Sequence, residues 1–197
     1  MQKITFLKNS DIKTNQPVLN RIFKLREQTF KQRLDWEVST TNGLERDSFD
    51  QLEVSHIAMT NDNDEVIGCW RALPTQGKYM LKDVFPELLQ GELAPQNKEV
   101  WEISRFAIQK GDGQAGTSLV TSSTADLVNS FFDFAIENNI KHYVLVTTLA
   151  CERILRLLEI PSRRMGKGKS MQIGVERSVA LWIDVDAVLA SRTQLVA

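Results

Sequence analysis

The stretch VWEISRFAI, Val100–Ile108, decides how this sequence is interpreted. Its Val, Trp, Ile and Phe residues, uninterrupted by Gly or Pro, predict a strand in the interior of a domain. The same run carries Glu102, Ser104 and Arg105. Because a buried charge is strongly unfavourable unless it is paired, such a strand indicates either a buried ion network or a binding pocket.

The spacing of the two charges in this strand adds a constraint. Glu102 and Arg105 are an odd number of residues apart, so a regular strand would point them to opposite faces. If both side chains serve one pocket, the strand must contain a bulge near Ser104. A bulge would also separate neighbouring strands and open a cleft for an extended substrate.

The composition is that of an ordinary globular protein. Of the 197 residues, 42% are hydrophobic, which is enough to bury a core without staples. A net charge of −1 indicates no general attraction to nucleic acid or to anionic membranes. No apolar run reaches the ~18 residues of a membrane span, and the N-terminus shows no secretory signal. Cys69 and Cys151 fit neither a disulfide framework nor a metal site. We expect a soluble cytoplasmic protein without membrane insertion or a metal.

Strands and helices alternate along the predicted fold. The expected strands cover residues 4–7, 56–60, 66–73, 100–108, 143–148 and 174–185. The expected helices cover residues 15–31, 119–138 and 151–159, with a short helix interrupted by Pro86. Loops are expected at 33–53, at GDGQAGTS and at 161–170. This order predicts an α/β or α+β three-layer fold, and the lack of repeats and linkers predicts a single domain over 1–197.

Several charged and aromatic residues are candidates for a site. Arg26 and Phe30 are four apart and share a helix face, and Asp47 and Asp50 lie close together in the long loop. For any one of them a solvated surface position is the default. Arg71, like the charges of the 100–108 strand, stands in an apolar strand, and this favours a pocket, with a purely structural ion network as the alternative.

These positions, taken in order, resemble a known family. Arg26-x-x-x-Phe30, Trp36, Asp47-x-x-Asp50, GCWR ending in Arg71, and WEISRFAI with Glu102 and Arg105 look like the LuxI-type acyl-homoserine lactone synthases, which make bacterial quorum-sensing signals. The resemblance runs from the first helix to ERSVAL near the end. It implies an α/β fold like the GNAT acyltransferases, a three-layer α/β/α arrangement with a twisted mixed sheet.

The resemblance also implies two substrates and no separate cofactor. They are S-adenosylmethionine and a fatty acyl chain on acyl carrier protein, and the products are an N-acyl-homoserine lactone, methylthioadenosine and free carrier protein. The implied catalytic residues are Glu102, Asp47, Asp50, Arg71 and Arg105. The implied substrate-binding residues are Arg26, Phe30, Trp36, Phe106, Thr147 and Thr148.

The chemistry of these residue types suits that reaction. The methionine amine must lose a proton before it attacks the thioester, and Glu102 is the candidate base. Asp47 and Asp50 suit the ammonium and sulfonium of S-adenosylmethionine, and the rings of Phe30 and Trp36 could face the sulfonium. Arg26, Arg71 or Arg105 could hold the substrate carboxylate through paired hydrogen bonds.

A basic segment offers a docking surface for the acidic carrier protein. It comprises Arg153, Arg156, Arg163 and Arg164, followed by Lys167 and Lys169. The alternative is a solvated helix face followed by a basic loop.

Two rival functions are consistent with parts of the sequence. A GNAT-type N-acetyltransferase using acetyl-CoA would cradle pyrophosphate in a glycine-rich loop, and residues 110–115 nearly match its pattern. Such an enzyme has no need for Asp47, Asp50 and S-adenosylmethionine. The other rival is a non-enzymatic member that binds a signal or a partner without turnover.

Overall fold

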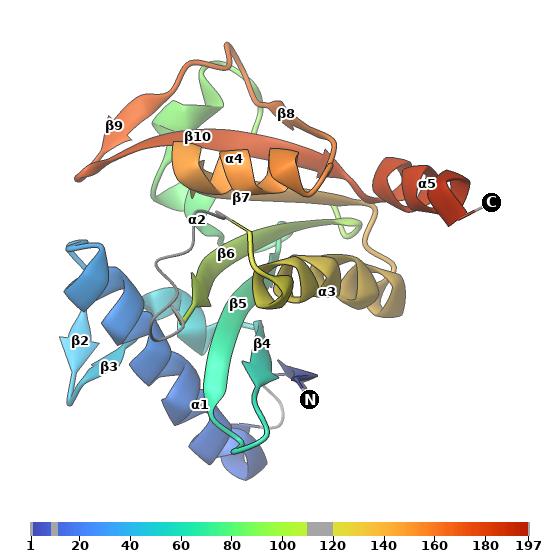
Figure 1. The fold of residues 1–197 in the computed structure, drawn as a ribbon. Coiled ribbons are helices and arrows are strands. Elements are labelled where there is room, and N and C mark those ends of the chain that lie inside the picture. The colour runs from blue at the N-terminus through green and yellow to red at the C-terminus, as the bar shows by residue number, and fades with distance from the viewer. Residues whose placement is uncertain (1, 9–11, 110–119, 197) are drawn as a thin grey trace. The chain divides into compact units, whose positions relative to one another are not determined.

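The computed structural model describes residues 2–8, 12–109 and 120–196 of the chain (Figure 1). The chain forms two compact units, the first from Met1–Ala72 and Ser104–Leu127, the second from Leu73–Ile103 and Val128–Ala197. A single domain over the whole chain stays a prediction. No helix in the described ranges is both long enough and apolar enough to cross a membrane.

The first unit is built on an antiparallel sheet. Strand β1 (Lys3–Lys8) pairs with β4 (Ser55–Thr60), and β4 pairs with β5 (Val66–Pro74). The second half of β6 (Val100–Ile108) follows β5, where the Gln109 N–H donates to the Ile67 carbonyl at 2.8 Å. The strands expected at 4–7, 56–60, 66–73 and 100–108 are therefore confirmed.

A long helix covers one face of this sheet. The apolar residues Leu19, Ile22 and Phe23 of α1 (Ile12–Arg26) are buried in a core with Ala58 and Cys69 from the strands. The helix does not continue to residue 31 as an α-helix, because a π-helical segment, η2 (Glu27–Arg33), takes over after Arg26. The wider turn is a form that is frequent at functional sites.

The expected loop over 33–53 contains regular structure, so that prediction was too coarse. A hairpin joins β2 (Thr40–Thr41) to β3 (Leu44–Glu45), and its turn residues Asn42 and Gly43 have φ values of +53° and +72°. Asn-Gly is the preferred pair for such a turn. A 3₁₀-helix, η3 (Ser48–Gln51), follows directly. The hairpin and the 3₁₀-helix set the positions of the acidic residues in this segment.

The second unit contains a mixed sheet. The first half of β6 runs parallel to β7 (His142–Thr148), and β7 runs antiparallel to β10 (Glu176–Asp184). Strands β8 (Ser162–Arg164) and β9 (Met171–Ile173) pair with β10. The strands expected at 143–148 and 174–185 are confirmed, each with slightly different ends.

The helices of the second unit depart from expectation in detail. The short helix around Pro86 is present as α2 (Met80–Asp83) and the 3₁₀-helix η4 (Pro86–Leu89). Helix α4 (Leu149–Leu157) begins two residues early, because the Thr148 hydroxyl caps it by accepting the Cys151 N–H at 3.3 Å. Helix α3 (Ser122–Asn138) shares its residues between the units. Helix α5 (Val185–Val196) was not expected at all.

The expected loop over 161–170 was wrong for its first part, since Ser162–Arg164 forms β8. Glu92 holds both parts of this segment, because it accepts two hydrogen bonds from Arg163 of β8 at 3.0 and 2.7 Å and the N–H of Gly166, which follows β8, at 2.6 Å. These bonds attach the basic segment to the turn that follows η4.

The bulge and cleft expected near Ser104 stay predictions, but β6 does contain one left-handed residue next to Ser104. Arg105 has a φ of +55°, which a regular strand residue does not adopt. The glycine-rich loop GDGQAGTS, including residues 110–115, lies outside the described residues.

We predict that Gly166→Ala destabilises the protein far more than Gly174→Ala. Both glycines have left-handed φ values, +58° and +55°, so each alanine would be strained by about 1 kcal/mol or more. At Gly166 the added Cβ would also lie 2.0 Å from the Leu89 carbonyl oxygen, whereas nothing lies within 4 Å at Gly174. We expect a loss of about 3 kcal/mol or more at Gly166 in denaturant unfolding. Equal losses in the two variants would contradict this packing.

Candidate active site

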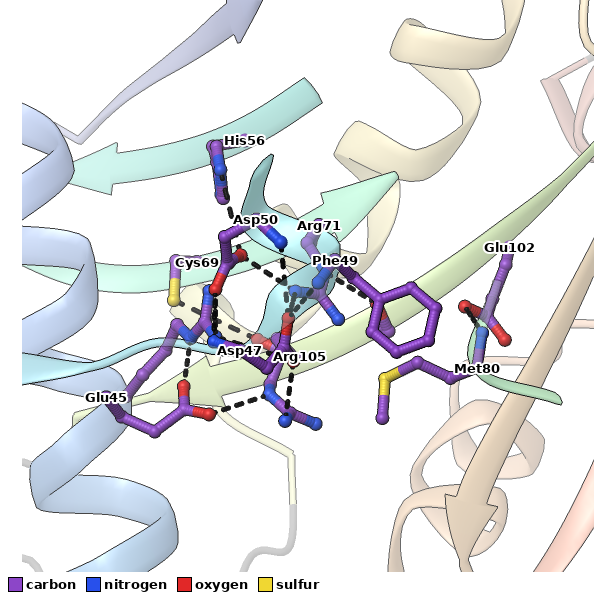
Figure 2. A network of polar contacts seen from close by, with 12 residues as sticks. Glu45, Asp47, Phe49, Asp50, His56, Cys69, Arg71, Met80, Glu102 and Arg105 are labelled. Atoms are coloured by element: carbon purple, nitrogen blue, oxygen red, sulfur yellow. Dashed lines mark hydrogen bonds and ion pairs between the residues drawn. The ribbon is translucent and has the colours of Figure 1, made fainter. Parts of the chain in front are cut away.

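Six charged side chains of the first unit form one buried ion network, shown in Figure 2. Its members are Arg26, Glu45, Asp47, Asp50, Arg71 and Arg105. Three guanidinium groups meet three carboxylates, so the formal charges balance. The structure thus brings together five of the residues proposed from sequence and adds one that the sequence reasoning missed.

Asp50 is the centre of one half of the network. Arg26 donates to its two carboxylate oxygens at 2.8 and 2.9 Å, in the bidentate geometry that is strongest for such pairs. Arg71 donates at 2.7 Å to the same carboxylate and at 2.6 Å to Asp47. Arg26 and Arg71 are 1% and 0% exposed, so removing one partner would leave an uncompensated charge in the core.

The backbone of η3 holds these two aspartates in place. Asp47 accepts the N–H groups of Phe49 and Asp50 at 2.9 and 3.2 Å, and the Asp50 carboxylate accepts the Asp47 N–H at 2.8 Å. This reciprocal capping box fixes the start of the 3₁₀-helix. The spacing of three residues noted in the sequence is therefore what a capping box requires.

Glu45 closes the other half of the network and was not proposed from sequence. One of its oxygens accepts from Arg26 Nε, and the other accepts from Arg105 Nε at 3.1 Å. Arg105 also forms an ion pair with Asp47 at 2.7 Å. Glu45 follows the Asn42–Gly43 turn, so the Asn-Gly hairpin signal in the sequence could have indicated that this segment is ordered.

The arginines keep the buried aspartates ionised. Burial by itself would raise the pKa of Asp50, but the Arg26 and Arg71 guanidinium groups outweigh burial and hold that pKa well below its ordinary value. Burial likewise opposes ionisation of Asp47, while Arg71 and Arg105 lower its pKa. Both carboxylates therefore act as fixed negative charges and not as proton acceptors near neutral pH.

An aromatic pair lies beside the network. Phe30 and Trp36 stack with ring centroids 5.1 Å apart, and the Arg105 guanidinium lies 5.6 Å from the Phe30 ring centroid. The Trp36 indole nitrogen is buried without a hydrogen-bond partner among the described residues. Phe106 is half-buried on β6 in the same unit. Their contact with a substrate stays a prediction.

Glu102 belongs to the second unit, where its carboxylate caps a helix. One oxygen accepts the Leu81 N–H at 2.6 Å and the other accepts the Met80 N–H at 2.8 Å, and the side chain is fully buried (Figure 2). These two N–H groups lie at the start of α2, where the N–H groups of the first turn have no acceptor within the helix. The sequence reasoning did not foresee this capping role.

The other proposed residues of the second unit have distinct surroundings. Thr148 uses its hydroxyl to cap α4, and Thr147 is half-buried in β7 opposite Val179. Arg163 and Arg164 are paired with Glu92 and Glu152. Arg153 and Arg156 are exposed and form no ion pair within the described part of the chain. Within that same part, no three His, Cys, Asp or Glu residues are grouped as metal ligands.

A buried histidine lies against the network. His56 is 2% exposed, its Nε2 lies 3.9 Å from an Asp50 oxygen, and its ring meets Phe23 edge-on at 5.5 Å. A pocket of about 250 Å³ lies beside these three residues. Burial, helped by the positive charges of Arg26 and Arg71, lowers the pKa of His56 to about 4. The imidazole is therefore neutral near neutral pH.

The sequence matches known enzymes over most of its length. A family model for autoinducer synthases matches residues 10–193. The acyl-homoserine-lactone synthase of Vibrio anguillarum is 39% identical over 165 residues, 84% of this chain and 85% of that protein. That of Pseudomonas aeruginosa is 38% identical over 175 residues, 88% and 85% of the two chains.

Solved structures agree with these matches. The crystal structure of the AHL synthase LasI is 34% identical with a TM-score of 0.83, covering 94% of this chain and 90% of that one. TofI, solved in a ternary complex with an inhibitor and MTA, is 26% identical with a TM-score of 0.79, covering 96% and 95%. The chain belongs to the autoinducer synthase family. It is an enzyme, an acyl-homoserine-lactone synthase.

More distant structures show the fold alone. BjaI, a CoA-dependent acyl-homoserine lactone synthase solved with SAM and isopentyl-CoA, is 19% identical with a TM-score of 0.83, covering 97% of this chain and 89% of that one. A Lactobacillus plantarum protein assigned to the N-acetyltransferases is 14% identical with a TM-score of 0.60, covering 93% and 98%. The expected α/β class with a mixed, GNAT-like sheet is confirmed.

We predict that His56 makes the protein less stable as the pH falls from 6.5 to 4. The unfolded chain binds a proton at its ordinary pKa of 6.5, whereas the folded chain binds it only near 4, so protons favour unfolding across this window. The full difference corresponds to about 3 kcal/mol. The stabilisation from Asp47 and Asp50 is complete above their ordinary pKa of 3.8 and is lost only as the pH falls below it, because the pKa values of both groups are lowered in the fold.

Urea unfolding of wild type and His56→Gln at several pH values measures this contribution. The variant should show a flatter dependence between pH 6.5 and 4. His142→Gln is the matched control, because it removes the other histidine, which is 33% exposed, and should keep the wild-type slope. A wild-type curve that is already flat in this window would disprove the assignment.

Proposed function

We propose that this synthase acylates the amine of S-adenosylmethionine with an acyl thioester and then closes the lactone. In the first step an N–C bond forms and the thioester C–S bond breaks. In the second step, the substrate carboxylate attacks the substrate carbon that carries the sulfonium, so an O–C bond forms, the C–S bond breaks and methylthioadenosine leaves. The balanced ion network beside the Phe30–Trp36 pair is the observation that carries the proposal. The MTA complex of TofI, at 26% identity, supports it.

Side-chain exposure divides the ion network into residues that only stabilise it, called the framework here, and residues that can contact a substrate. All three arginines of the network pair with carboxylates of the chain, but the Arg26 and Arg71 side chains are only 1% and 0% exposed, so we assign these two to the framework. Arg105 is 12% exposed, the most accessible of the three guanidinium groups, and we assign it to the substrate carboxylate. Asp47 is 17% exposed against 5% for Asp50, so Asp47 is the better partner for the substrate ammonium.

Glu102 is the proposed base for the substrate amine. Its two backbone hydrogen bonds orient the carboxylate, which is proposed to take the proton of the amine directly or through water. The cap therefore positions the group as well as starting α2. No nucleophile of the enzyme is needed, because the substrate amine attacks the thioester itself.

The acyl donor is proposed to be a carrier protein that docks on the basic face of α4. Arg153 and Arg156 are three residues apart on this helix and both are exposed. The CoA dependence of BjaI, at 19% identity, makes acyl-CoA the donor to compare. The alternative function, an acetyl-CoA N-acetyltransferase, is supported by the near match of residues 110–115 and by a shared fold at 14% identity.

Calorimetry with S-adenosylmethionine and a turnover assay test the proposal together. The full chain should bind S-adenosylmethionine and, given an acyl-carrier protein, release methylthioadenosine and an N-acyl-homoserine lactone, both measurable by mass spectrometry. Acyl-CoA in place of the carrier protein identifies the preferred donor. Lack of binding at millimolar S-adenosylmethionine would remove the proposal.

We predict that Glu102→Gln lowers kcat/KM by about 100-fold or more, the typical contribution of a positioned base. The Kd for S-adenosylmethionine should change less than about threefold, since binding is assigned to other residues. The substitution also weakens the start of α2, because an amide offers only one acceptor oxygen to the Met80 and Leu81 N–H groups.

Asp83→Ala separates the two effects of that substitution. Asp83 accepts the Tyr79 N–H at 2.8 Å at the same helix start, and alanine cannot accept this bond, so the variant should have a lower Tm while turnover is retained. If Glu102→Gln loses stability but keeps wild-type kcat/KM and pH profile, Glu102 is a capping residue and not the base.

A further inference from the structure

A charged groove lies between α4 and β8 in the second unit. Its volume is about 480 Å³. The charged residues that line it are Glu152, Arg153, Arg156, Glu159 and Arg164. Both elements belong to the segment proposed to receive the carrier protein, so the groove is part of that docking surface.

Two of these charges neutralise each other. Arg164 donates from Nε and from a terminal nitrogen to the two oxygens of Glu152, each at 2.7 Å. A third bond, from its other terminal nitrogen to the Gly168 carbonyl at 3.0 Å, holds the guanidinium from the opposite side. The hydrogen bonds that Arg164 donates to Glu152 raise the pKa of Arg164. Arg164 is thus already engaged by a carboxylate of its own chain, in the geometry that an acidic partner would use.

The remaining charges of the groove are differently placed. Arg153, Arg156 and Glu159 form no ion pair among the described residues, and all three are exposed. An acidic protein approaching the groove therefore meets two available guanidinium groups directly. It reaches the third only by displacing Glu152. Because an exposed ion pair contributes little, this exchange is energetically accessible.

We propose that Glu152 is a specificity-determining residue, which limits the affinity of the groove for an acidic carrier protein by competing for Arg164. This inference rests on the proposed function, since it needs a carrier-protein donor. Within the basic segment, Arg153 and Arg156 attract the carrier protein directly, whereas Arg164 is engaged by the Glu152 carboxylate until the carrier protein displaces it.

Steady-state kinetics with an acyl-carrier protein test the inference through matched variants. Glu152→Gln frees Arg164, which stays tethered to the Gly168 carbonyl, and should lower the KM for the carrier protein about two- to fivefold, the range expected for one exposed ion pair. Glu159→Gln removes the same charge from the same groove without releasing an arginine, so its effect should be smaller. The KM for S-adenosylmethionine should stay within twofold in both.

A double-mutant cycle isolates the pair. Arg164→Gln should raise the carrier-protein KM more in the Glu152→Gln background than in wild type, because only there is the guanidinium available to the partner. Since Glu152 lies in the first turn of α4, where a carboxylate favours the helix, Tm is recorded for each variant. Rescue of the wild-type KM by Glu152→Asp would support a role for the carboxylate itself.

The outcomes distinguish this inference from the proposed function. If charge reversal of Arg153 and Arg156 raises the carrier-protein KM while Glu152→Gln and Glu159→Gln behave alike, the docking face stands and the role of Glu152 is overturned. If wild type uses acyl-CoA but no carrier protein, the donor assignment and this inference both fall. If wild type makes no lactone from either donor, the proposed function itself fails.

Discussion

The first unit depends on one constraint, which is that charges buried in a protein must be paired. Arg26, Glu45 and Arg71 are at most 1% exposed, and each is satisfied by opposite charges within hydrogen-bond distance. Three cations and three anions cancel, so the network can exist in a core that also contains Phe23 and Phe30. Removing one member would leave its partners unpaired, at a cost of about 3–5 kcal/mol for such groups.

Local structure explains how residues distant in sequence meet in this network. Arg26 ends α1 where the helix widens to a π turn, and Glu45 follows an Asn-Gly hairpin. A capping box orders the two aspartates, and the left-handed Arg105 turns within an otherwise extended strand. Each feature is small by itself, but together they bring six charged side chains into one network. The pairing in turn keeps the carboxylates charged, as the proposed binding of a cationic substrate requires.

The second unit shows how a structural contact and a proposed chemical role can share one side chain. Glu102 starts α2 through two backbone bonds, and the same bonds orient its carboxylate. In the basic segment, fewer positive charges are available to a partner than the number of arginines indicates, because Arg163 and Arg164 already form ion pairs with Glu92 and Glu152. Counting arginines therefore overestimates a docking surface unless internal partners are subtracted.

The sequence by itself determined the longer strands, the main helices and the family, because apolar periodicity and the order of Arg26, Asp47, Asp50, Arg71 and Glu102 are local or linear properties. Only the tertiary structure decided which charges pair, since Arg105 and its partner Glu45 are 60 residues apart. It likewise decided the cap formed by Glu102 and the strand within the supposed loop at 162–164. Partner choice depends on distances in space, and neither composition nor spacing along the chain contains them.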